Sequence, residues 1–143
     1  MFDRINIKVK QIENGVLPIY KRDGDVCLDC SSRVAVTVPA KSRKLVPLGF
    51  AMELPKGFEA VVRPRSGLSK DGIDIAVGTI DSNYRGEVMA CVINNTDKDF
   101  QIKAGNRICQ LAIREVPIVT LEVVAELSDT ERGSDGFGSS GLY

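Results

Sequence analysis

The sequence predicts an all-β chain: a single-domain, jelly-roll-like barrel or sandwich followed by a mobile, glycine-rich C-terminal arm. Short apolar or alternating runs recur between turn signals such as Glu13-Asn14-Gly15 and Pro55-Lys56-Gly57, which is typical of a β-sandwich or barrel. From Ser128 onward apolar residues almost vanish, as in a segment that cannot form a core. A length of 143 residues predicts one domain, with the barrel over residues 1–127 and the arm over residues 128–143.

The first half of the chain contains the expected early strands of the barrel. Ile5, Ile7 and Val9 alternate with polar residues, which is the pattern of a half-buried strand. Pro18 cannot donate a hydrogen bond to a neighbour, so the short run around it fits an edge strand. In order, strands are predicted over residues 5–9, 17–20, 34–38, 45–52 and 58–63.

The second half adds a short helical turn and the remaining strands. The turn is expected over residues 66–70, and strands are expected over 88–93, 100–102, 107–113 and 116–124. A helix over residues 120–132 is the alternative for the last segment, because some of its apolar residues share a helical face. The adjacent β-branched Val123 and Val124 disfavour that helix, so a strand is the favoured prediction.

The composition excludes several classes of function. The 19 basic and 19 acidic residues balance to zero net charge, which argues against a nucleic-acid-binding face. Because the chain has no histidine, Ser-His or Cys-His nucleophile pairs and histidine-bound metals are excluded. Acid–base chemistry would fall to carboxylates, lysine or tyrosine. The start has no apolar signal segment and no run could span a membrane, so we expect a soluble, cytoplasmic protein without a membrane partner.

The cysteines include one pair with the CxxC spacing of some zinc and redox sites, Cys27 and Cys30. The other two, Cys91 and Cys109, lie far apart in the sequence and do not form a second close pair. On an extended strand Cys27 and Cys30 would point to opposite faces. Free, mostly buried thiols in a reducing compartment are therefore the favoured interpretation.

The stretch from Gly78 to Glu87 brings together an acid, a ring and a glycine. Asp81 stands at the start of a turn, and Tyr84 and Gly86 follow before the strand expected over residues 88–93. On one tight hairpin these groups could form a small-molecule pocket. Aspartate, serine and asparagine are also ordinary turn residues, so this stretch alone is more typical of a plain β-turn.

Two further stretches could hold phosphate groups. Arg65, Ser66 and Gly67 follow an expected strand, and a guanidinium, a hydroxyl and an exposed amide can bind phosphate oxygens there. A proline-initiated turn explains the same residues equally well. Gln110 would point away from its two apolar neighbours on a strand, so it could face a cleft.

The polar arm contains Arg132 and Phe137 among glycines and serines. A purely disordered tail has no particular need of either residue. An arm that closes over a ligand could use both.

In their order and spacing these stretches resemble the homotrimeric, all-β dUTPase family. The resemblance runs from Leu17 to Gly141, and its strongest matches are residues 64–74, 78–87, 105–111 and 132–141. It implies hydrolysis of dUTP to dUMP and pyrophosphate, which keeps uracil out of DNA. It also implies Mg²⁺ held mainly by the substrate phosphates, and a homotrimer whose active sites lie at subunit interfaces.

The resemblance assigns the catalytic and base-reading residues. Asp81 matches the carboxylate that activates the attacking water, as a general base. Tyr84 matches the ring that packs on the deoxyribose and leaves no room for a 2′-hydroxyl. The hairpin backbone would read the uracil edge at Gly78, Thr79, Ile80 and Met89.

The resemblance also assigns the groups that hold the phosphates and cover the base. The residues matching phosphate and water holders are Arg65, Ser66, Gly67 and Gln110. In the arm, Arg132 matches the arginine at the terminal phosphate and Phe137 the ring over uracil, while Gly138 and Ser139 match phosphate contacts. Closure of such an arm would exclude water from the site.

The chain departs from the family pattern at some positions. The first family motif is usually Ala-Gly-aromatic-Asp-Leu, whereas residues 26–30 are Val-Cys-Leu-Asp-Cys. Asp29 remains, and in the family this acid helps hold metal-bound water, so it is the predicted metal-site residue. Ala76 and Asp135 stand where glycine is common in the family, and Asp135 adds negative charge near a triphosphate.

Two alternatives remain beside dUTP hydrolysis. A dCTP deaminase-related enzyme of the same fold is disfavoured because Ser-Gly-Leu-Ser-Lys follows Arg65, instead of a Ser-Ser-x-Ala-Arg pattern. A nucleotide-responsive regulatory binding module would keep the pocket and lose turnover. The presence of Asp81, Tyr84, Arg132 and Phe137 disfavours that as the only role.

Overall fold

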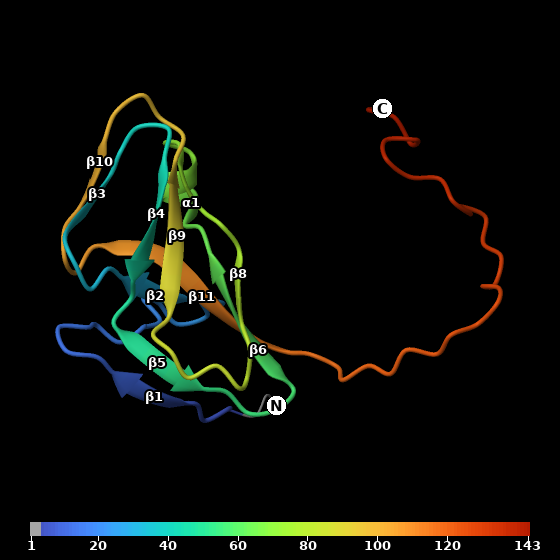
Figure 1. The fold of residues 1–143 in the computed structure, drawn as a ribbon, viewed down its shortest axis with the longest axis horizontal. Coiled ribbons are helices and arrows are strands. Elements are labelled where there is room, and N and C mark those ends of the chain that lie inside the picture. Colours follow the sequence, from blue (N-terminus) through green and yellow to red (C-terminus); the bar gives the residue numbers. More distant parts are fainter. Residues whose placement is uncertain (1–3) are drawn as a thin grey trace.

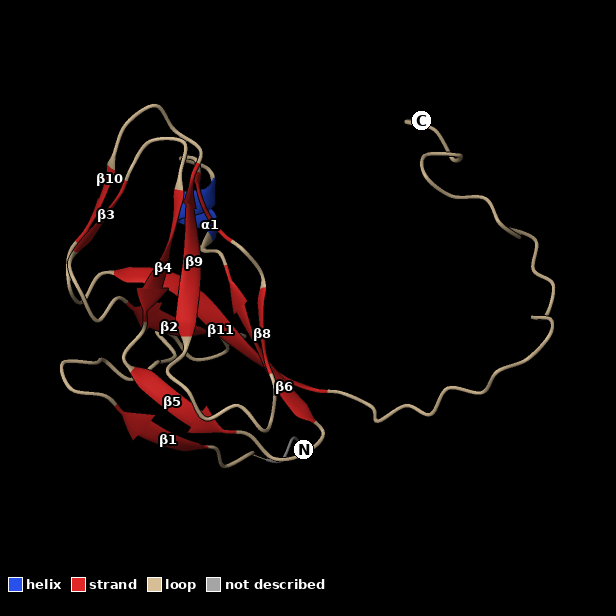
Figure 2. Ribbon diagram, in the orientation of Figure 1, coloured by secondary structure: helices blue, strands red, loops and turns tan. Residues whose placement is uncertain are grey.

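The computed structural model describes residues 4–143 and confirms the all-β prediction (Figures 1 and 2). Every strand pair in that range is antiparallel. Its elements, in chain order, are β1 (Lys8–Gln11), β2 (Leu28–Ser31), β3 (Val36–Val38), β4 (Arg43–Pro47), β5 (Phe50–Glu53), β6 (Phe58–Arg63), α1 (Ser66–Ser69), β7 (Ile73–Ile75), β8 (Gly78–Ile80), β9 (Met89–Asn94), β10 (Phe100–Ile102) and β11 (Arg107–Glu115).

Two sheets form the body of the molecule. One has the strand order β2-β11-β6-β8, and the other has the order β4-β9-β7. In Figure 1 strands β4 and β9 run steeply across β2 and β11, so the arrangement is a sandwich. The shorter pairs β1-β5 and β3-β10 complete it. One hydrophobic cluster is shared by the two main sheets and includes Val46, Ala90, Val92, Ala60, Val62 and Leu111.

Strand β9 shows why this sequence forms a packed sheet. Ala90, Val92 and Asn94 are buried, whereas the residues between them are partly exposed. Successive side chains of a strand point to opposite faces, so one face of β9 lies in the core. The register of β9 against β4 and β7 is thereby fixed, because a slip by one residue would move that face to solvent.

The apolar run over residues 45–52 is not one strand. Gly49 adopts a positive φ of 83°, which only glycine adopts at little cost, and the chain breaks there into β4 and β5. Gly15 lies directly against this corner, since a Cβ on Gly15 would lie 2.1 Å from the Gly49 carbonyl oxygen. Ile12 N also donates to Gly49 O at 2.9 Å. The backbones therefore meet at a distance that side chains would prevent.

Other sequence-based expectations are met in part. The strands over 58–63 and 100–102 and the helical turn near Ser66 are confirmed. The first strand begins later than expected, and residues 17–20 contribute only an isolated bridge between Ile19 and Asp29. The sequence reasoning missed β2 and β7, which are only four and three residues long.

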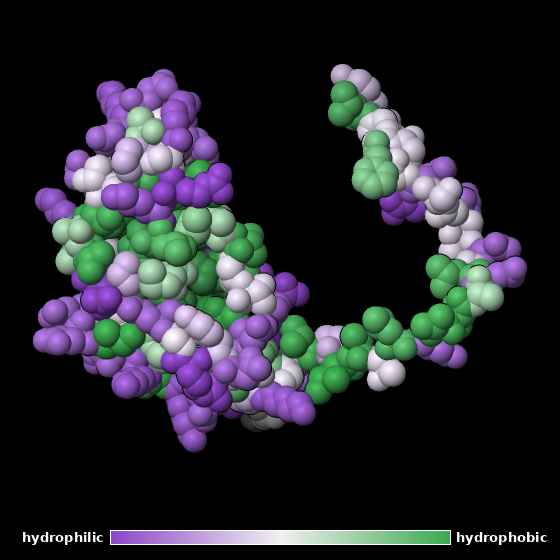
Figure 3. Space-filling view, viewed as in Figure 1, coloured by the Kyte–Doolittle hydropathy of each residue, from purple (hydrophilic) through white to green (hydrophobic). Residues whose placement is uncertain are grey.

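The prediction of a strand over residues 116–124 is wrong for this chain, which has neither strand nor helix after Glu115. Figure 1 shows the segment leaving the body, and Figure 3 shows apolar side chains along it. Leu121 is 88% exposed and Val123 is 97% exposed. The β-branched residues have no neighbouring backbone to pair with, and a strand forms only against a partner.

None of the helical structure in residues 4–143 is long or apolar enough to cross a membrane.

Asn94 connects β9 to the adjacent turn and to β3. Its side-chain amide donates to the carbonyl oxygens of Val38 at 3.0 Å and Lys98 at 2.8 Å, and its carbonyl accepts from Thr96. We expect Asn94→Ala to lower the free energy of unfolding by about 2–3 kcal/mol, because buried polar groups lose their partners. Urea denaturation at fixed protein concentration measures this change. Exposed Asn95→Ala is the control and should change the free energy by under about 0.5 kcal/mol.

Candidate functional site

The loop with Asp81 and Tyr84 joins the two main sheets. Strand β8 pairs with β6, with Ile80 opposite Ala60, whereas β9 pairs with β4 and β7. The expectation of one tight hairpin is therefore wrong, because no ladder joins β8 to β9 in the described chain. The loop spans a split between the sheets.

The split leaves open backbone groups that the two strands of a continuous hairpin would hydrogen-bond to each other. The β7–β9 ladder pairs Ile75 with Val92, and Ala76 N then donates to Cys91 O at 3.0 Å. Continuing that register would place Gly78 opposite Met89, but among residues 77–90 no backbone hydrogen bond joins these two segments. Amide and carbonyl groups beside Gly78 and Met89 are thus available to a ligand.

Tyr84 folds back over the end of its own loop. Its Oη donates to Glu87 O at 2.9 Å, and its backbone N donates to Asp81 O at 3.1 Å. A Cβ on Gly86 would lie 2.4 Å from Tyr84 Oη, so only glycine allows this ring position. The ring is 43% exposed and presents a free face.

Glu87 anchors the same loop through its side chain. Arg33 donates to both carboxylate oxygens, from Nε at 2.8 Å and from a terminal nitrogen at 3.1 Å. Gly49 N donates to the same carboxylate at 2.9 Å. The hydrogen bond from Arg33, aided by the Gly49 amide, lowers the pKa of Glu87 from its usual value, although partial burial opposes the shift.

Asp81 lies exposed in a concavity of about 730 Å³. The walls come from the start of β6, the turn before it and the first residues after β11, including Lys56, Glu59 and Val116. Arg85 also lines it, and donates to Ser82 O at 2.6 Å. An exposed carboxylate on a loop held from both sides can accept a proton from a bound water.

The predicted phosphate holders gather at the other end of β6. Gln110 donates to Pro64 O at 2.9 Å, and Arg65 donates to Arg107 O at 2.9 Å. Ser66 and Gly67 are exposed at the start of α1, and no atom lies within 4 Å of a Cβ placed on Gly67. The sheet therefore brings these predicted residues together with an open surface beside them.

Asp29 lies within this group, and its carboxylate forms ion pairs with two arginines. Arg107 donates to one carboxylate oxygen at 3.0 Å, and Arg65 Nε lies 3.9 Å from the other. No group of three or more metal-ligating side chains occurs in residues 4–143. The Asp29 carboxylate, already paired with cations, does not by itself form a magnesium site, since Mg²⁺ prefers several oxygen ligands.

The two predicted halves of the site are far apart within one chain. Asp81 stands next to Ile80, which pairs with Ala60 near the start of β6, whereas Arg65 follows the end of that strand. Six residues of extended chain separate these levels, or roughly 20 Å. One chain thus does not bring Asp81 to Arg65.

The arm also lies away from both groups (Figure 1). Arg132 Nε donates to Asp135 O at 2.9 Å, and Phe137 is fully exposed with a φ of 54°. The backbone hydrogen bonds of residues 117–143 are all within the arm. The predicted arm residues, which also include Gly138 and Ser139, are therefore in contact with one another but with no other predicted site residue.

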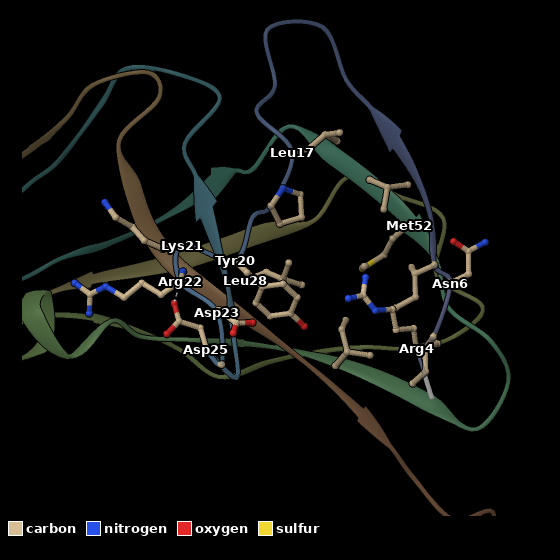
Figure 4. Close-up of a pocket in the computed structure, with 16 residues that line it drawn as sticks. Arg4, Asn6, Leu17, Tyr20, Lys21, Arg22, Asp23, Asp25, Leu28 and Met52 are labelled. Atoms are coloured by element: carbon tan, nitrogen blue, oxygen red, sulfur yellow. Dashed lines mark hydrogen bonds between the residues drawn. The ribbon is translucent and has the colours of Figure 1, made fainter. Parts of the chain in front are cut away.

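A second concavity, of about 840 Å³, contains none of the predicted site residues (Figure 4). Arg4 and Asn6 lie on one side of it and Arg22, Asp23 and Asp25 lie on the other.

The four cysteines are free, as expected, and Cys30 and Cys109 are buried opposite each other on β2 and β11. The hydrogen bond between these thiols and their burial raise the pKa of Cys30, which makes it a poor nucleophile.

The sequence reasoning did not single out Arg33, Glu87 or Arg107. Glu87 and Arg107 belong to the stretches that carry the family resemblance, so their motif was a usable signal. Arg33 belongs to none of them, and its partner is 54 residues away.

Comparisons with known proteins agree over nearly the whole chain. A family model described as dUTPase matches residues 13–141. The chain is 42% identical over 134 residues to the deoxyuridine 5′-triphosphate nucleotidohydrolase of Paramecium bursaria Chlorella virus 1, which covers 93% of this chain and 95% of that relative. The protein of the same name from Orientia tsutsugamushi (strain Boryong) is 43% identical over 147 residues, covering 96% and 99%.

The fold is also that of a solved phage structure. Staphylococcus bacteriophage 80alpha dUTPase with dUPNHPP superposes with a TM-score of 0.90 at 26% identity, covering 96% of this chain and 99% of that one.

The lowered pKa of Glu87 makes the stability of the loop anchor dependent on pH. A carboxyl group whose folded pKa is lowered stabilises the fold above its usual pKa of 4.5 and loses this effect as the pH falls further. We expect Glu87→Gln to be less stable than the parent at pH 7, with the difference shrinking as the pH falls below 4.5. Thermal unfolding across this range measures it. Glu13→Gln, an exposed position, should show no such trend.

Proposed function

The chain belongs to the dUTPase family, as its sequence resemblance predicted, and we propose that it hydrolyses dUTP to dUMP and pyrophosphate. The single observation that favours this most is the open split between β8 and β9, with Asp81 and Tyr84 on the loop that spans it. A flat base can enter between the two backbones. Uracil presents one donor between acceptors, and the backbone near Gly78 and Met89 offers groups of both kinds.

Discrimination between bases would follow from these fixed backbone groups. The positions that the family resemblance assigns to this role are Gly78, Thr79, Ile80 and Met89. Cytosine has an acceptor at N3 and a donor at the neighbouring 4-amino group, the reverse of uracil at both positions, and it would leave buried backbone groups unpaired, a strong penalty. The methyl group of thymine would need space that a narrow split lacks.

Asp81 would act as the general base of the reaction. Its carboxylate takes a proton from a water as the oxygen attacks the α-phosphorus. The bond from this phosphorus to the bridging oxygen breaks, and pyrophosphate leaves with that oxygen. No covalent enzyme intermediate is required, which is consistent with a chain that has no histidine.

Tyr84 would select deoxyribose over ribose. The hydroxyl is held by Glu87 O and the ring rests on Gly86, so the exposed face of the ring has little freedom to retreat. A 2′-hydroxyl pressed against it would be excluded sterically and would lose its hydrogen bonds to water.

The triphosphate would lie against Arg65, Ser66, Gly67 and Gln110. Arginine and an exposed amide are well suited to phosphate oxygens. We propose Mg²⁺ as part of the substrate, bound by the phosphates, because the carboxylate of Asp29, the predicted metal-site residue, is paired with Arg107. Asp29 would contribute through the water around the ion.

A homotrimer with shared sites is the assembly we propose. Two features of the single chain support it: the separation between Asp81 and Arg65, and the exposed apolar segment over residues 116–127, just before the arm. Ile118 is 75% exposed and Leu127 is 87% exposed, and a run of such residues is typical of a protein–protein contact. A second copy could supply both the missing half of the site and the surface that covers the arm.

The end of the arm would then act as a lid on a neighbouring site. The residues concerned are Arg132 for the terminal phosphate, Phe137 for stacking on uracil, and Gly138 and Ser139 for further phosphate contacts. Positive φ angles at Phe137 and Gly138 form a tight bend, which presents ring and backbone together. Closure only over substrate would exclude water at the reacting phosphorus.

Hydrolysis is favoured over the two alternatives by the relatives. The two relatives described above bear the name of a dUTP nucleotidohydrolase at 42–43% identity. No feature of residues 4–143 specifically favours a dCTP deaminase or a purely regulatory module. A cytoplasmic location stays a prediction.

The substrate assignment predicts a clear order of reactivity. Pyrophosphate release should be fast with dUTP and lower by at least about 10²-fold with UTP, dTTP and dCTP, measured in parallel with and without Mg²⁺. Asp81→Asn should retain binding of a non-hydrolysable dUTP analogue and lose about 10²–10⁴-fold in kcat. Preference for another nucleotide, ammonia release from dCTP, or full turnover by Asp81→Asn would contradict the proposal.

Shared active sites predict complementation between two inactive variants. Asp81→Asn and Arg65→Ala should each lose most activity as pure proteins. If these residues come from different subunits, a refolded equal mixture should regain about a quarter of the parent activity, because random assembly restores that share of sites. A mixture as inactive as its components would place both residues in one chain's site. Mixing without unfolding is the control.

A further inference from the structure

Arg33 lies outside the motif stretches, yet it is the charged residue that fixes the Tyr84 loop. It contacts Glu87 through both arms of the guanidinium, at 2.8 and 3.1 Å. Two-point arginine–carboxylate contacts set direction as well as distance. The side chains of Arg33 and Glu87 are only 28% and 20% exposed, so water competes less than at the surface.

The position of Arg33 is set independently of the loop. Its backbone N donates to Pro47 O at 2.9 Å, at the end of β4. Next to it, Leu48 N donates to Val88 O and Val88 N donates to Phe50 O. The C-terminal end of the loop is therefore fixed from both sides of Gly49, which itself donates to Glu87.

The anchor is continuous with the sugar-facing ring. The Glu87 carboxylate accepts hydrogen bonds from Arg33, and the Glu87 backbone oxygen accepts one from Tyr84 Oη. A change of the Glu87 backbone that follows loss of Arg33 moves the acceptor of the tyrosine hydroxyl. The other side-chain contact of the loop to the body, between Arg85 and Glu53 at 3.4 Å, is about half exposed, so it holds the loop less firmly than the Arg33–Glu87 contact.

We propose that Arg33 is a positioning residue for nucleotide selection: acting through Glu87, it holds the Tyr84 ring where it excludes a 2′-hydroxyl. Arg33 touches no substrate atom in this scheme. The inference rests on the proposed function, because it names what sets the sugar preference of the same site.

The test replaces Arg33 and compares deoxyribose with ribose substrates. Arg33→Met keeps much of the apolar stem and removes the charge. We expect kcat/KM for dUTP to fall and the preference for dUTP over UTP to narrow, each by about tenfold, since small displacements of a positioning group are costly. Arg33→Lys should be intermediate, because lysine restores the charge without the two-point contact. If Arg33→Met folds poorly, Arg33→Lys still tests the preference for dUTP over UTP.

A matched control and a double variant separate positioning from general loss of stability. Lys41→Met also removes the cation of an ion pair, but Lys41 and Asp97 are exposed and 3.5 Å apart, so the dUTP preference should stay at the parent value. Tyr84→Phe should narrow the preference in the same direction as Arg33→Met. In the double variant the two effects should not multiply, because both act on one ring position. A parent-like preference in Arg33→Met, or fully multiplicative effects, would overturn the proposal.

Amide hydrogen exchange tests the anchor without any turnover. Residues 82–88 should exchange faster in Arg33→Met than in the parent or in Lys41→Met, with no nucleotide present. Unchanged exchange would overturn the inference. If the parent released no pyrophosphate from dUTP, the proposed function would fail, and faster exchange in Arg33→Met would still support the anchor.

Discussion

The end of the β7–β9 ladder is the constraint on which the site depends. After Ala76 N donates to Cys91 O, the chain leaves β9 and pairs as β8 with β6. Backbone groups are costly to leave unpaired in a core, so the split is tolerated only because it opens to the surface. The fold thereby keeps a narrow set of donors and acceptors for a ligand, at a point where a regular hairpin would have none.

Around this split the structure uses rigid anchors. Glu87 is held by Arg33 and Gly49, and Tyr84 is held by Glu87 and by its close approach to Gly86. These contacts fix a loop whose own residues are mostly exposed. A site that discriminates by shape needs such support, because a ring that can move away excludes nothing. At the other end of β6, the contacts of Arg65, Arg107 and Asp29 hold the phosphate-facing edge.

A single chain does not bring together all the residues of the proposed site. Asp81 and the predicted phosphate-binding residues are separated along β6, and the apolar side chains over residues 118–127 are exposed in the single chain. The association with further copies that we propose would account for both features. The family resemblance predicts the role of each site residue. The structure of the single chain shows which of these residues lie too far apart to act together.

The sequence by itself determined the all-β class, the long strands such as β6 and β9, and the motif residues Asp81 and Tyr84. The alternation of apolar and polar residues and the presence of turn residues are local signals, and both can be read directly from the sequence. Only the tertiary structure decided that the expected hairpin is split between sheets, that the run over residues 45–52 breaks at Gly49, and that residues 116–124 have no partner. It also brought Arg33 to Glu87. These outcomes depend on which distant backbones compete for hydrogen bonds and space, and local sequence does not encode that competition.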